Sequence, residues 1–207
     1  MEHLRKDYSK SILDETHLQE NPLDQFKKWF DEALFSEIAE PNAMILSTVG
    51  SDLKPSSRVV LLKNVNDEGF VFFTNYQSKK GKDLQENANA CLLFFWDKLE
   101  RQIRIEGTVK HLEATLSDNY FYSRPILSQI GSMISPQSSI LDHRKELEDK
   151  FEFYKSHQDQ IKRPDHWGGL CLVPEYFEFW QGRESRLHDR LTYQRGNNAW
   201  EIGRLAP

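Results

Sequence analysis

Apolar side chains first recur at helical spacing shortly after residue 20. Positions three or four residues apart fall on one face of a helix. Asn21 is a residue type favoured at helix N-caps, and Pro22 suits a first helical turn. The pattern predicts a helix over 21–40 with one apolar face. That face consists of Leu23, Phe26, Phe30, Leu34 and Ile38.

Between residues 43 and 112 the pattern changes to short apolar runs separated by polar turn segments. Such spacing is typical of an antiparallel meander or barrel. In the last run, from Arg101, apolar and polar residues alternate, which predicts a strand with two different faces. The predicted strands are 43–49, 56–63, 70–75, 90–96 and 101–112.

The remaining segments complete a mostly β fold class, a small β-barrel with peripheral α-helices. Residues 1–20 are polar and aperiodic, which predicts a flexible N-terminal arm, and 21–207 is predicted to be a single domain. The further predicted elements are helices 113–125 and 138–157, a buried strand ending at Trp180, and a hairpin of strands 190–195 and 199–205.

Composition limits the classes of partner. The chain has 27 Lys and Arg against 32 Asp and Glu, so its formal charge of −5 gives no electrostatic case for binding nucleic acid or a membrane surface. Cys91 and Cys171 lie in apolar runs and are interpreted as small buried hydrophobes. The N-terminus lacks the apolar core of a signal peptide, and no window approaches the ~20 apolar residues of a membrane span. We therefore expect a soluble, cytoplasmic protein.

Familiar catalytic signatures are absent from the sequence. It has no dinucleotide-binding glycine motif after a strand, no Walker loop, no nucleophile elbow and no paired Cys/His spacing. These absences argue against a nicotinamide-binding Rossmann domain and a zinc hydrolase, and no metal site is expected.

Polar groups instead recur at the ends of apolar strands. Arg58 and Lys63 flank four aliphatic residues, the segment 78–82 is rich in lysine, and 137–139 precedes a predicted helix whose amides could receive an anion. Tyr120, Arg124 and Ser128 follow at intervals of four. Each group has an ordinary reading as solvated charge or helix cap, and each is also suited to binding phosphate.

The segment "RLHDR" (186–190) is the most concentrated group. If it is extended, Arg186, His188 and Arg190 share one face of a strand. Like charges at that spacing repel unless they meet an anion or an electron-rich ligand, so a ligand-facing strand and a surface ion-pair network are both consistent with the pattern. His188 could exchange a proton near neutral pH.

Several of these segments, taken in order, resemble the pyridoxine (pyridoxamine) 5′-phosphate oxidase family. They are "RVVLLK", "FFTNYQSKKGKDL", "LERQIRIEG", "YFYSRPILSQIG", "QSS", "FWQGRESRLHDR" and the terminal "WEIGRLAP". The resemblance implies an FMN-binding split barrel, a homodimer with FMN at the interface. It also implies oxidation of pyridoxine or pyridoxamine 5′-phosphate by O2 to pyridoxal 5′-phosphate, with release of H2O2.

The resemblance also implies roles for individual residues. Arg186 and His188 are expected to be catalytic, Arg186 holding the substrate ring and His188 contacting or deprotonating the substituent at C4′. The expected FMN-binding residues are Arg58, Val59, Val60, Leu61, Leu62, Lys63, Phe73, Thr74, Lys79, Lys80, Gln102, Gln137, Ser138, Trp180 and Arg190. The expected substrate-binding residues are Lys63, Tyr120, Arg124, Ser128, Arg186 and His188, with Arg5 and Tyr8 in a lid formed by the arm.

One departure from the family pattern concerns the cofactor phosphate. Lys79 stands where the family commonly has arginine, which replaces a forked guanidinium by a point charge. Two alternatives to the oxidase remain at this point. One is another split-barrel flavoprotein, such as a flavin reductase-like enzyme or an oxidase of a different substrate, and the other is a non-catalytic carrier of FMN or pyridoxal phosphate.

Overall fold

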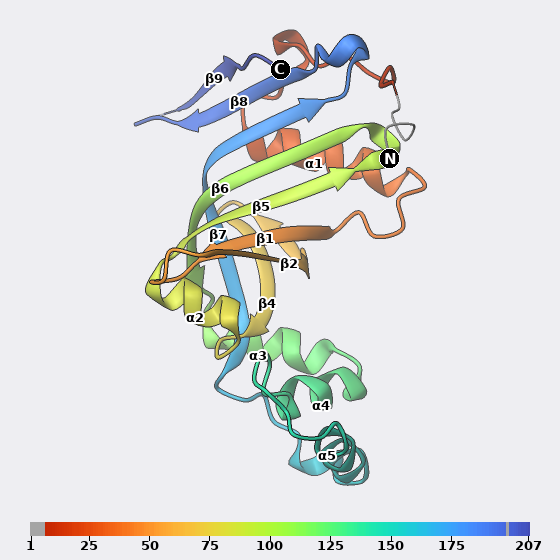
Figure 1. Ribbon diagram of the computed structural model, residues 1–207, viewed down its shortest axis with the longest axis vertical. Coiled ribbons are helices and arrows are strands. Elements are labelled where there is room, and N and C mark those ends of the chain that lie inside the picture. The colour runs from red at the N-terminus through yellow and green to blue at the C-terminus, as the bar shows by residue number, and fades with distance from the viewer. Residues whose placement is uncertain (1–6, 198) are drawn as a thin grey trace.

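The computed structural model describes residues 7–197 and 199–207 (Figure 1). The α-helices are α1 (Pro22–Leu34), α2 (Lys79–Glu86), α3 (Ala114–Ser123), α4 (Ile126–Ile134) and α5 (Lys145–Ser156). The strands are β1 (Ala43–Val49), β2 (Pro55–Leu61), β3 (Asn64–Asn66), β4 (Gly69–Asn75), β5 (Asn89–Trp96), β6 (Arg101–His111), β7 (Trp167–Gln181), β8 (Asp189–Arg195) and β9 (Trp200–Arg204).

The strands form one antiparallel sheet that curls into a split barrel. Its main path runs β2-β1-β5-β6-β7-β4-β3, with the β8–β9 hairpin attached to β7. Although β2 and β3 lie at opposite ends of this path, only Leu62 and Lys63 separate them in the chain. Because so short a link spans about 11 Å at most, the two edges must lie close together. The contact between β2 and β4 agrees with this curvature.

Helix α1 packs against the sheet through its aromatic residues. Asn21 caps it by accepting a hydrogen bond from the Leu23 amide, as predicted. Phe26 meets Phe70 edge to face at 4.8 Å between ring centroids. The helix ends at Leu34, so the prediction of a helix to residue 40 was too long. Leu23 and Phe26 are buried as predicted, but Leu34 is 55% exposed, and Trp29 and Ala33 are buried in the second half of the helix.

A β-bulge divides β7 into two halves. The pairing of β6 with β7 passes over Glu175, where the register shifts beside Gly107. A Cβ on Gly107 would lie 2.0 Å from the Val173 carbonyl oxygen, which is why glycine is required there. The bulge changes which alternate residues face the core. Those residues are Leu170 and Leu172 before it and Phe177 and Phe179 after it.

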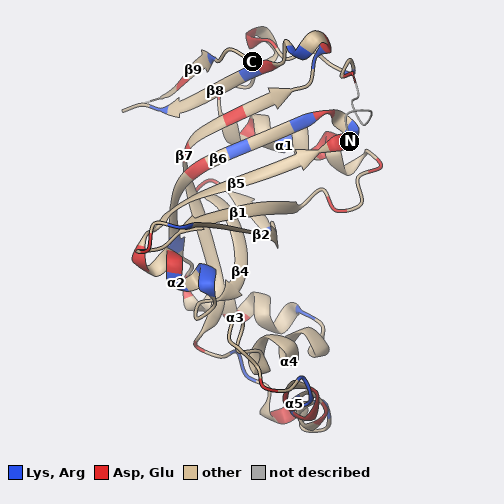
Figure 2. Ribbon diagram, viewed as in Figure 1, with Lys and Arg blue, Asp and Glu red and all other residues tan. Residues whose placement is uncertain are grey.

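Helices α3, α4 and α5 lie together at one end of the molecule, and the β8–β9 hairpin lies toward the other (Figure 1). The prediction of a helix over 113–125 is confirmed by α3, whereas 138–157 was predicted too long because α5 begins at Lys145. Helices α2 and α4 were not predicted. Basic and acidic residues are interspersed over β6 and on α2, in keeping with the small net charge (Figure 2).

Candidate functional site

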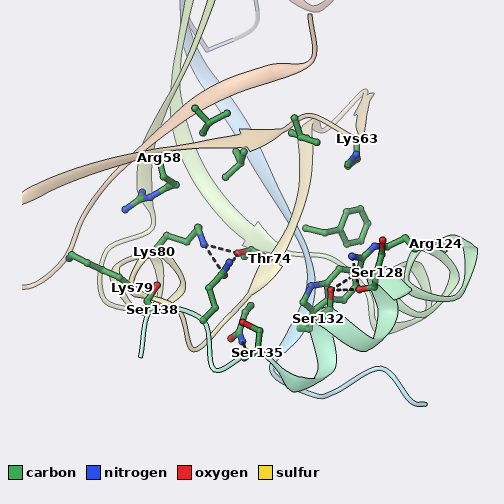
Figure 3. A pocket seen from close by; sticks show the side chains of 18 of the residues that line it. Arg58, Lys63, Thr74, Lys79, Lys80, Arg124, Ser128, Ser132, Ser135 and Ser138 are labelled. Atoms are coloured by element: carbon green, nitrogen blue, oxygen red, sulfur yellow. Dashed lines mark hydrogen bonds between the residues drawn. The ribbon is translucent and has the colours of Figure 1, made fainter. Parts of the chain in front are cut away.

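A pocket with a volume of about 1060 Å³ lies between the barrel and helices α3 and α4. It is open to solvent and is bounded by β2, β4, the start of α2 and the segment after α4 (Figure 3). The predicted site residues that line it are Arg58, Val59, Val60, Leu61, Lys63, Phe73, Thr74, Lys79, Lys80, Tyr120, Arg124, Ser128, Gln137 and Ser138.

One end of the pocket holds a buried ammonium group. Lys80 is 8% exposed, and its Nζ donates to Thr74 Oγ1 at 3.1 Å and to Gln137 Oε1 at 3.0 Å (Figure 3). It also donates to Ser78 Oγ at 3.2 Å. All three partners are neutral. Burial, and to a lesser extent the charge of Arg58, lowers the pKa of Lys80 to about 8. A buried cation held only by neutral acceptors is suited to receive an anion.

Arg58 and Lys79 stand beside Lys80 but share a carboxylate. Lys79 Nζ lies 3.0 Å from Asp83 Oδ1, and Arg58 Nη2 lies 3.9 Å from Asp83 Oδ2. Arg58 also donates to the Leu46 carbonyl oxygen and to Thr48 Oγ1, which holds its guanidinium along β1. The charge of Lys79 is therefore already compensated, whereas that of Lys80 is not.

The opposite end of the pocket holds Arg124. Its guanidinium donates to Ser132 Oγ at 2.8 Å and to the Ser128 carbonyl oxygen at 3.0 Å (Figure 3). It also lies over the Trp167 ring, 4.8 Å from the centroid. Burial lowers the pKa of Arg124, although the residue stays charged at any physiological pH. Lys63 stands exposed on the pocket wall, so this end too presents cations to a ligand.

Helix α4 supplies pocket residues that the sequence analysis missed. Pro125 turns the chain after α3, as expected, so that Tyr120, Arg124 and Ser128 converge from two helices. Ser132 and Ser135 join Ser128 along one side of α4. Their spacing of four and three residues, between isoleucines that pack inward, was the available signal. Other lining residues not predicted are Ser56, Ser57, Asn75, Pro125, Gly131 and Trp167.

A second set of predicted residues lies outside this pocket. The register aligns Gln102 on β6 with Trp180 on β7, and Trp180 with Arg190 on β8, so the three side chains form a row across the sheet. Arg186 and His188 follow in the loop between β7 and β8. We call Gln102, Trp180, Arg186, His188 and Arg190 the loop cluster. It lies toward the hairpin end of the molecule, away from α3–α5 (Figure 1).

Arg190 is held by a buried carboxylate. Glu178 is 3% exposed and accepts from Arg190 Nε at 2.7 Å and from Arg104 Nη2 at 2.9 Å. Burial alone would raise the pKa of Glu178, but the hydrogen bonds and charges of the two arginines outweigh it and lower the pKa. Arg190 also donates to the Ala206 carbonyl oxygen. Its guanidinium is therefore positioned from two sides.

The loop 182–188 is not extended, so the prediction that strand periodicity aligns Arg186, His188 and Arg190 was wrong. Residues Glu184–Arg186 form a short 3-10 helix, and Ser185 and Arg186 both have positive φ, 54° and 63°. The loop folds back until the Arg183 amide reaches His188 Nδ1 at 3.1 Å. His188 and Arg190 come close through this fold and the sheet register instead.

The N-terminal arm is docked against the loop cluster in this structure. Tyr8 lies edge to face with Trp180 at 5.8 Å. The amides of Ser9 and Lys10 donate to the carboxylate of Glu100 at 2.9 and 3.0 Å. This places Tyr8 beside the loop cluster, whereas Arg5 lies outside the described residues. The flexibility of the arm and its role as a lid remain predictions.

Three further predicted residues have surroundings that differ from those expected. Leu62 is 6% exposed and packs in the core between β2 and β3, so its side chain does not line the pocket. Gln137 and Ser138 do line the pocket, but in a turn, and the expected helix N-terminus behind them is absent because residues 138–144 are not helical. Ser138 has φ of 72°.

The described residues hold neither a metal-binding cluster nor a membrane-spanning helix. They contain no cluster of three or more His, Cys, Asp or Glu side chains arranged to hold a metal ion. None of the helices in the described part of the chain combines the length and apolarity needed to cross a bilayer.

Comparison with family models gives two matches that together cover most of the chain. Residues 30–158 match the model described as pyridoxamine 5′-phosphate oxidase. Residues 167–207 match the model described as the pyridoxine 5′-phosphate oxidase C-terminal dimerisation region. The second match begins with β7 and includes Trp180, Arg186, His188 and Arg190.

Individual proteins agree with these matches. The chain is 53% identical to a pyridoxine/pyridoxamine 5′-phosphate oxidase of Nostoc punctiforme, over 99% of this chain and 97% of that protein. It is 49% identical to one of Salinibacter ruber with the same coverage. Among solved structures, PhzG from Burkholderia lata, in complex with tetrahydrophenazine-1-carboxylic acid, superposes with a TM-score of 0.91. It is 31% identical and covers 96% of this chain and 100% of that one.

Proposed function

The chain belongs to the pyridoxine/pyridoxamine 5′-phosphate oxidase family, and from that premise we propose that it oxidises pyridoxine and pyridoxamine 5′-phosphates to pyridoxal 5′-phosphate. The alcohol reacts with O2 to give the aldehyde and H2O2. The amine reacts with O2 and water to give the aldehyde, ammonia and H2O2.

The observation that carries the proposal is a single pocket with a cation at each end, Lys80 at one and Arg124 at the other. Neither is paired with a carboxylate among the described residues. Two phosphate groups, one from cofactor and one from substrate, match that arrangement.

FMN is the cofactor, and the pocket fits it. The buried ammonium of Lys80 and the guanidinium of Arg58 suit its phosphate, and the aliphatic residues of β2 suit its apolar ring system. We assign the phosphate to Arg58, Lys80, Gln137 and Ser138, with Lys79 in a lesser role. FMN, when bound, supplies the two-electron acceptor for the reaction.

We propose that the loop cluster completes the site across a homodimer. The matched dimerisation region includes most of the loop cluster, and the cluster lies outside the pocket of its own chain. Trp167 at the pocket and Trp180 in the loop cluster are thirteen residue steps apart on β7, a span of about 40 Å along an extended strand. A ligand of FMN size cannot touch both in one chain, whereas a partner chain can bring its loop cluster to this pocket.

The substrate phosphate then belongs at the Arg124 end of the pocket. Arg124, Lys63, Tyr120 and Ser128 would fix it, and binding energy gained there would orient C4′ for hydride transfer. From the partner chain, Arg186 would hold the substrate ring and Arg190 would face the flavin, with His188 beside the substrate. Glu178 keeps Arg190 in place for that role.

A stoichiometric test distinguishes the oxidase from its alternatives. The purified protein, loaded with FMN, receives pyridoxine 5′-phosphate without O2 while its visible spectrum is recorded. Bleaching of the flavin, followed by pyridoxal phosphate absorbance when air is admitted, supports the oxidase. A protein that binds FMN but does not bleach is a carrier or an enzyme for another substrate, and the proposal then fails.

The superposition with PhzG raises a second substrate class, a tricyclic carboxylic acid without phosphate. Arg124 has no carboxylate partner among the described residues, and three serines lie near it along α4. These groups favour a phosphate-bearing substrate over the tricyclic acid. Parallel bleaching assays with pyridoxine and with its 5′-phosphate test this choice. Equal rates at low concentration would count against a phosphate site at Arg124.

We place the reaction in the cytoplasm. The free thiols of Cys91 and Cys171 support a reducing compartment.

A further inference from the structure

The hydrogen bond at His188 Nδ1 determines which ring nitrogen carries the proton. The backbone N–H of Arg183 donates to His188 Nδ1 at 3.1 Å. A backbone amide can only donate, so Nδ1 must accept and cannot carry a proton of its own. In the neutral ring the proton therefore resides on Nε2, and Nε2 offers an N–H rather than a lone pair.

The Arg183 amide is held in place by its surroundings. The Arg183 side chain donates to Asp189 Oδ2 at 2.9 Å, and the Leu13 amide donates to the same oxygen at 3.1 Å. Arg204 pairs with the other oxygen, Oδ1, at 3.1 Å. Positive φ at Ser185 brings the loop back toward His188, a conformation that costs energy in a non-glycine residue and persists only because the neighbours fix it.

The groups facing His188 favour its neutral form. The ring lies 4.7 Å from Trp180 and 6.0 Å from Tyr8, between centroids. Burial and then the charge of Arg186 lower the pKa of His188, while Asp189 opposes them. A proton on Nδ1 would also set two N–H groups against each other. The neutral ring with Nε2–H is therefore the form present at and above neutral pH.

We propose that the Arg183 amide holds His188 as the Nε2–H tautomer, so that His188 acts on the substrate as a hydrogen-bond donor and is not the base of the reaction. Nε2 is occupied by its proton, and the only lone pair of the ring is occupied by the Arg183 amide. Arg183 thereby gains a function as a positioning residue through its backbone. The substrate assignment rests on the proposed function, but the position of the proton does not.

The first test reads the tautomer directly in the FMN-free protein. Protein labelled with 15N-histidine is compared with a His188→Gln variant to assign the His188 nitrogens in a long-range 1H–15N spectrum. We expect a pyridine-like shift for Nδ1 and a pyrrole-like shift for Nε2 at pH 7.5. The reverse pattern would overturn the proposal. Because no turnover is involved, this outcome is independent of whether the protein oxidises pyridoxine phosphate.

The second test uses the two amide side chains that mimic each ring nitrogen. Glutamine at 188 can place an NH2 donor near Nε2, whereas asparagine reaches only the Nδ1 position. We expect His188→Gln to keep kcat/KM within about tenfold and His188→Asn to lose about 10- to 100-fold, the range for a hydrogen bond to a charged or strongly polar group. We also expect the acidic limb of the pH profile to be the same in His188→Gln as in the wild type. Equal loss in both variants, with disappearance of that limb, would identify His188 as the base and refute the donor role.

Discussion

The pocket and the loop cluster are both rich in cationic side chains, but the partners of those side chains differ. In the pocket, Lys80 and Arg124 are bonded to hydroxyl, amide and carbonyl oxygens. In the loop cluster, Arg190 is paired with the buried carboxylate of Glu178. Asp189 similarly pairs with Arg183 beside His188. Lys80 and Arg124 therefore carry uncompensated positive charge, whereas Arg190 and Arg183 are each paired with a carboxylate.

This difference predicts that the two regions differ in stability and rigidity before a ligand binds. A pocket that buries cations without carboxylates is less stable empty and gains when an anion arrives. Arginines paired with a carboxylate of low exposure, as Arg190 is with Glu178, are held in position before any ligand arrives. Substitutions in the two regions should therefore affect stability and binding in opposite proportions.

The largest effect is expected for the carboxylate that braces Arg190. Glu178→Gln leaves the guanidiniums of Arg190 and Arg104, which are 29% and 37% exposed, without their buried partner, which should lower the free energy of unfolding by about 2 to 3 kcal/mol. Urea denaturation measures the change. Glu106→Gln is the matched control, because Glu106 pairs with the same Arg104 but its side chain is 47% exposed, and it should cost less than about 1 kcal/mol. Similar losses for both variants would contradict the bracing role.

The next effect separates binding from turnover and tests the shared site. Arg124→Ala should raise KM about 10- to 100-fold, because a charged phosphate contact is lost, whereas Arg186→Ala should mainly lower kcat. Equal small effects from both would contradict the assignment.

Mixing the two variant chains provides the control for that pair. Co-refolded Arg124→Ala and Arg186→Ala chains form mixed dimers in which one site has both native regions, so about a quarter of the wild-type activity should return. If each chain carried a whole site, mixing would restore nothing. Arg144→Ala serves as the neutral reference, since that side chain is 89% exposed.

Lys80 should behave oppositely to Glu178. Lys80→Met removes a buried charge that has only neutral partners, so the FMN-free protein should be at least as stable as the wild type. FMN affinity, measured by quenching of flavin fluorescence, should fall about 10- to 100-fold. Lys82→Met, on the exposed side of the same helix, should change neither quantity. Loss of stability without loss of affinity in Lys80→Met would make Lys80 a structural residue.

The pKa of Lys80 predicts that FMN affinity depends on pH, by at most tenfold per pH unit. Below its pKa of about 8 the ammonium is present before FMN binds. Above it, binding must take up a proton, so affinity should fall by up to tenfold per pH unit between pH 8 and 10. Riboflavin lacks the phosphate and should show no such decline. A flat FMN profile would mean that Lys80 does not contact the phosphate.

The smallest effect is expected at Lys79, the departure from the family pattern. Its ammonium is held by Asp83 at 3.0 Å and its side chain is 52% exposed. Lys79→Ala should weaken FMN binding by less than about fivefold, as for an exposed ion pair. A loss as large as that in Lys80→Met would show that Asp83 releases Lys79 to the phosphate.

Local patterns in the sequence predicted most of the barrel. The strands from β1 to β6 that carry apolar runs were found because each run stands between turn residues. Helix α2 was missed because its eight residues are mostly polar and contribute only Leu84 to the apolar core. Helix α4 was missed because Pro125 was interpreted only as a helix end, although proline is also common at helix starts.

The site was predictable in parts but not as an assembly. The resemblance to family motifs predicted individual site residues. The structure brings some of them, such as Lys80 and Arg124, into one pocket although they are far apart in the chain. Period-two spacing failed at 186–190 because the loop folds back. Hydrogen bonds to Asp189 from Arg183 and from Leu13 of the arm hold it there. Asp189 lies in a basic segment and Glu178 in an apolar one, and neither position indicates in the sequence which arginines the carboxylate pairs with.

The bulge at Glu175 has a consequence for how the chain tolerates length changes. It shifts the phase of β7 by one residue, so that Trp167 and Trp180 both lie on the face opposite the barrel core, although they are thirteen positions apart. Deleting Glu175 would preserve every residue of both regions but rotate one half of the strand by half a turn relative to the other. Either Phe177 and Phe179 would leave the core as Trp180 entered it, or Leu170 and Leu172 would leave it as Trp167 entered. Glu175, which belongs to neither region, thus determines that the pocket and the loop-cluster residues of β7 lie on the same face of the strand.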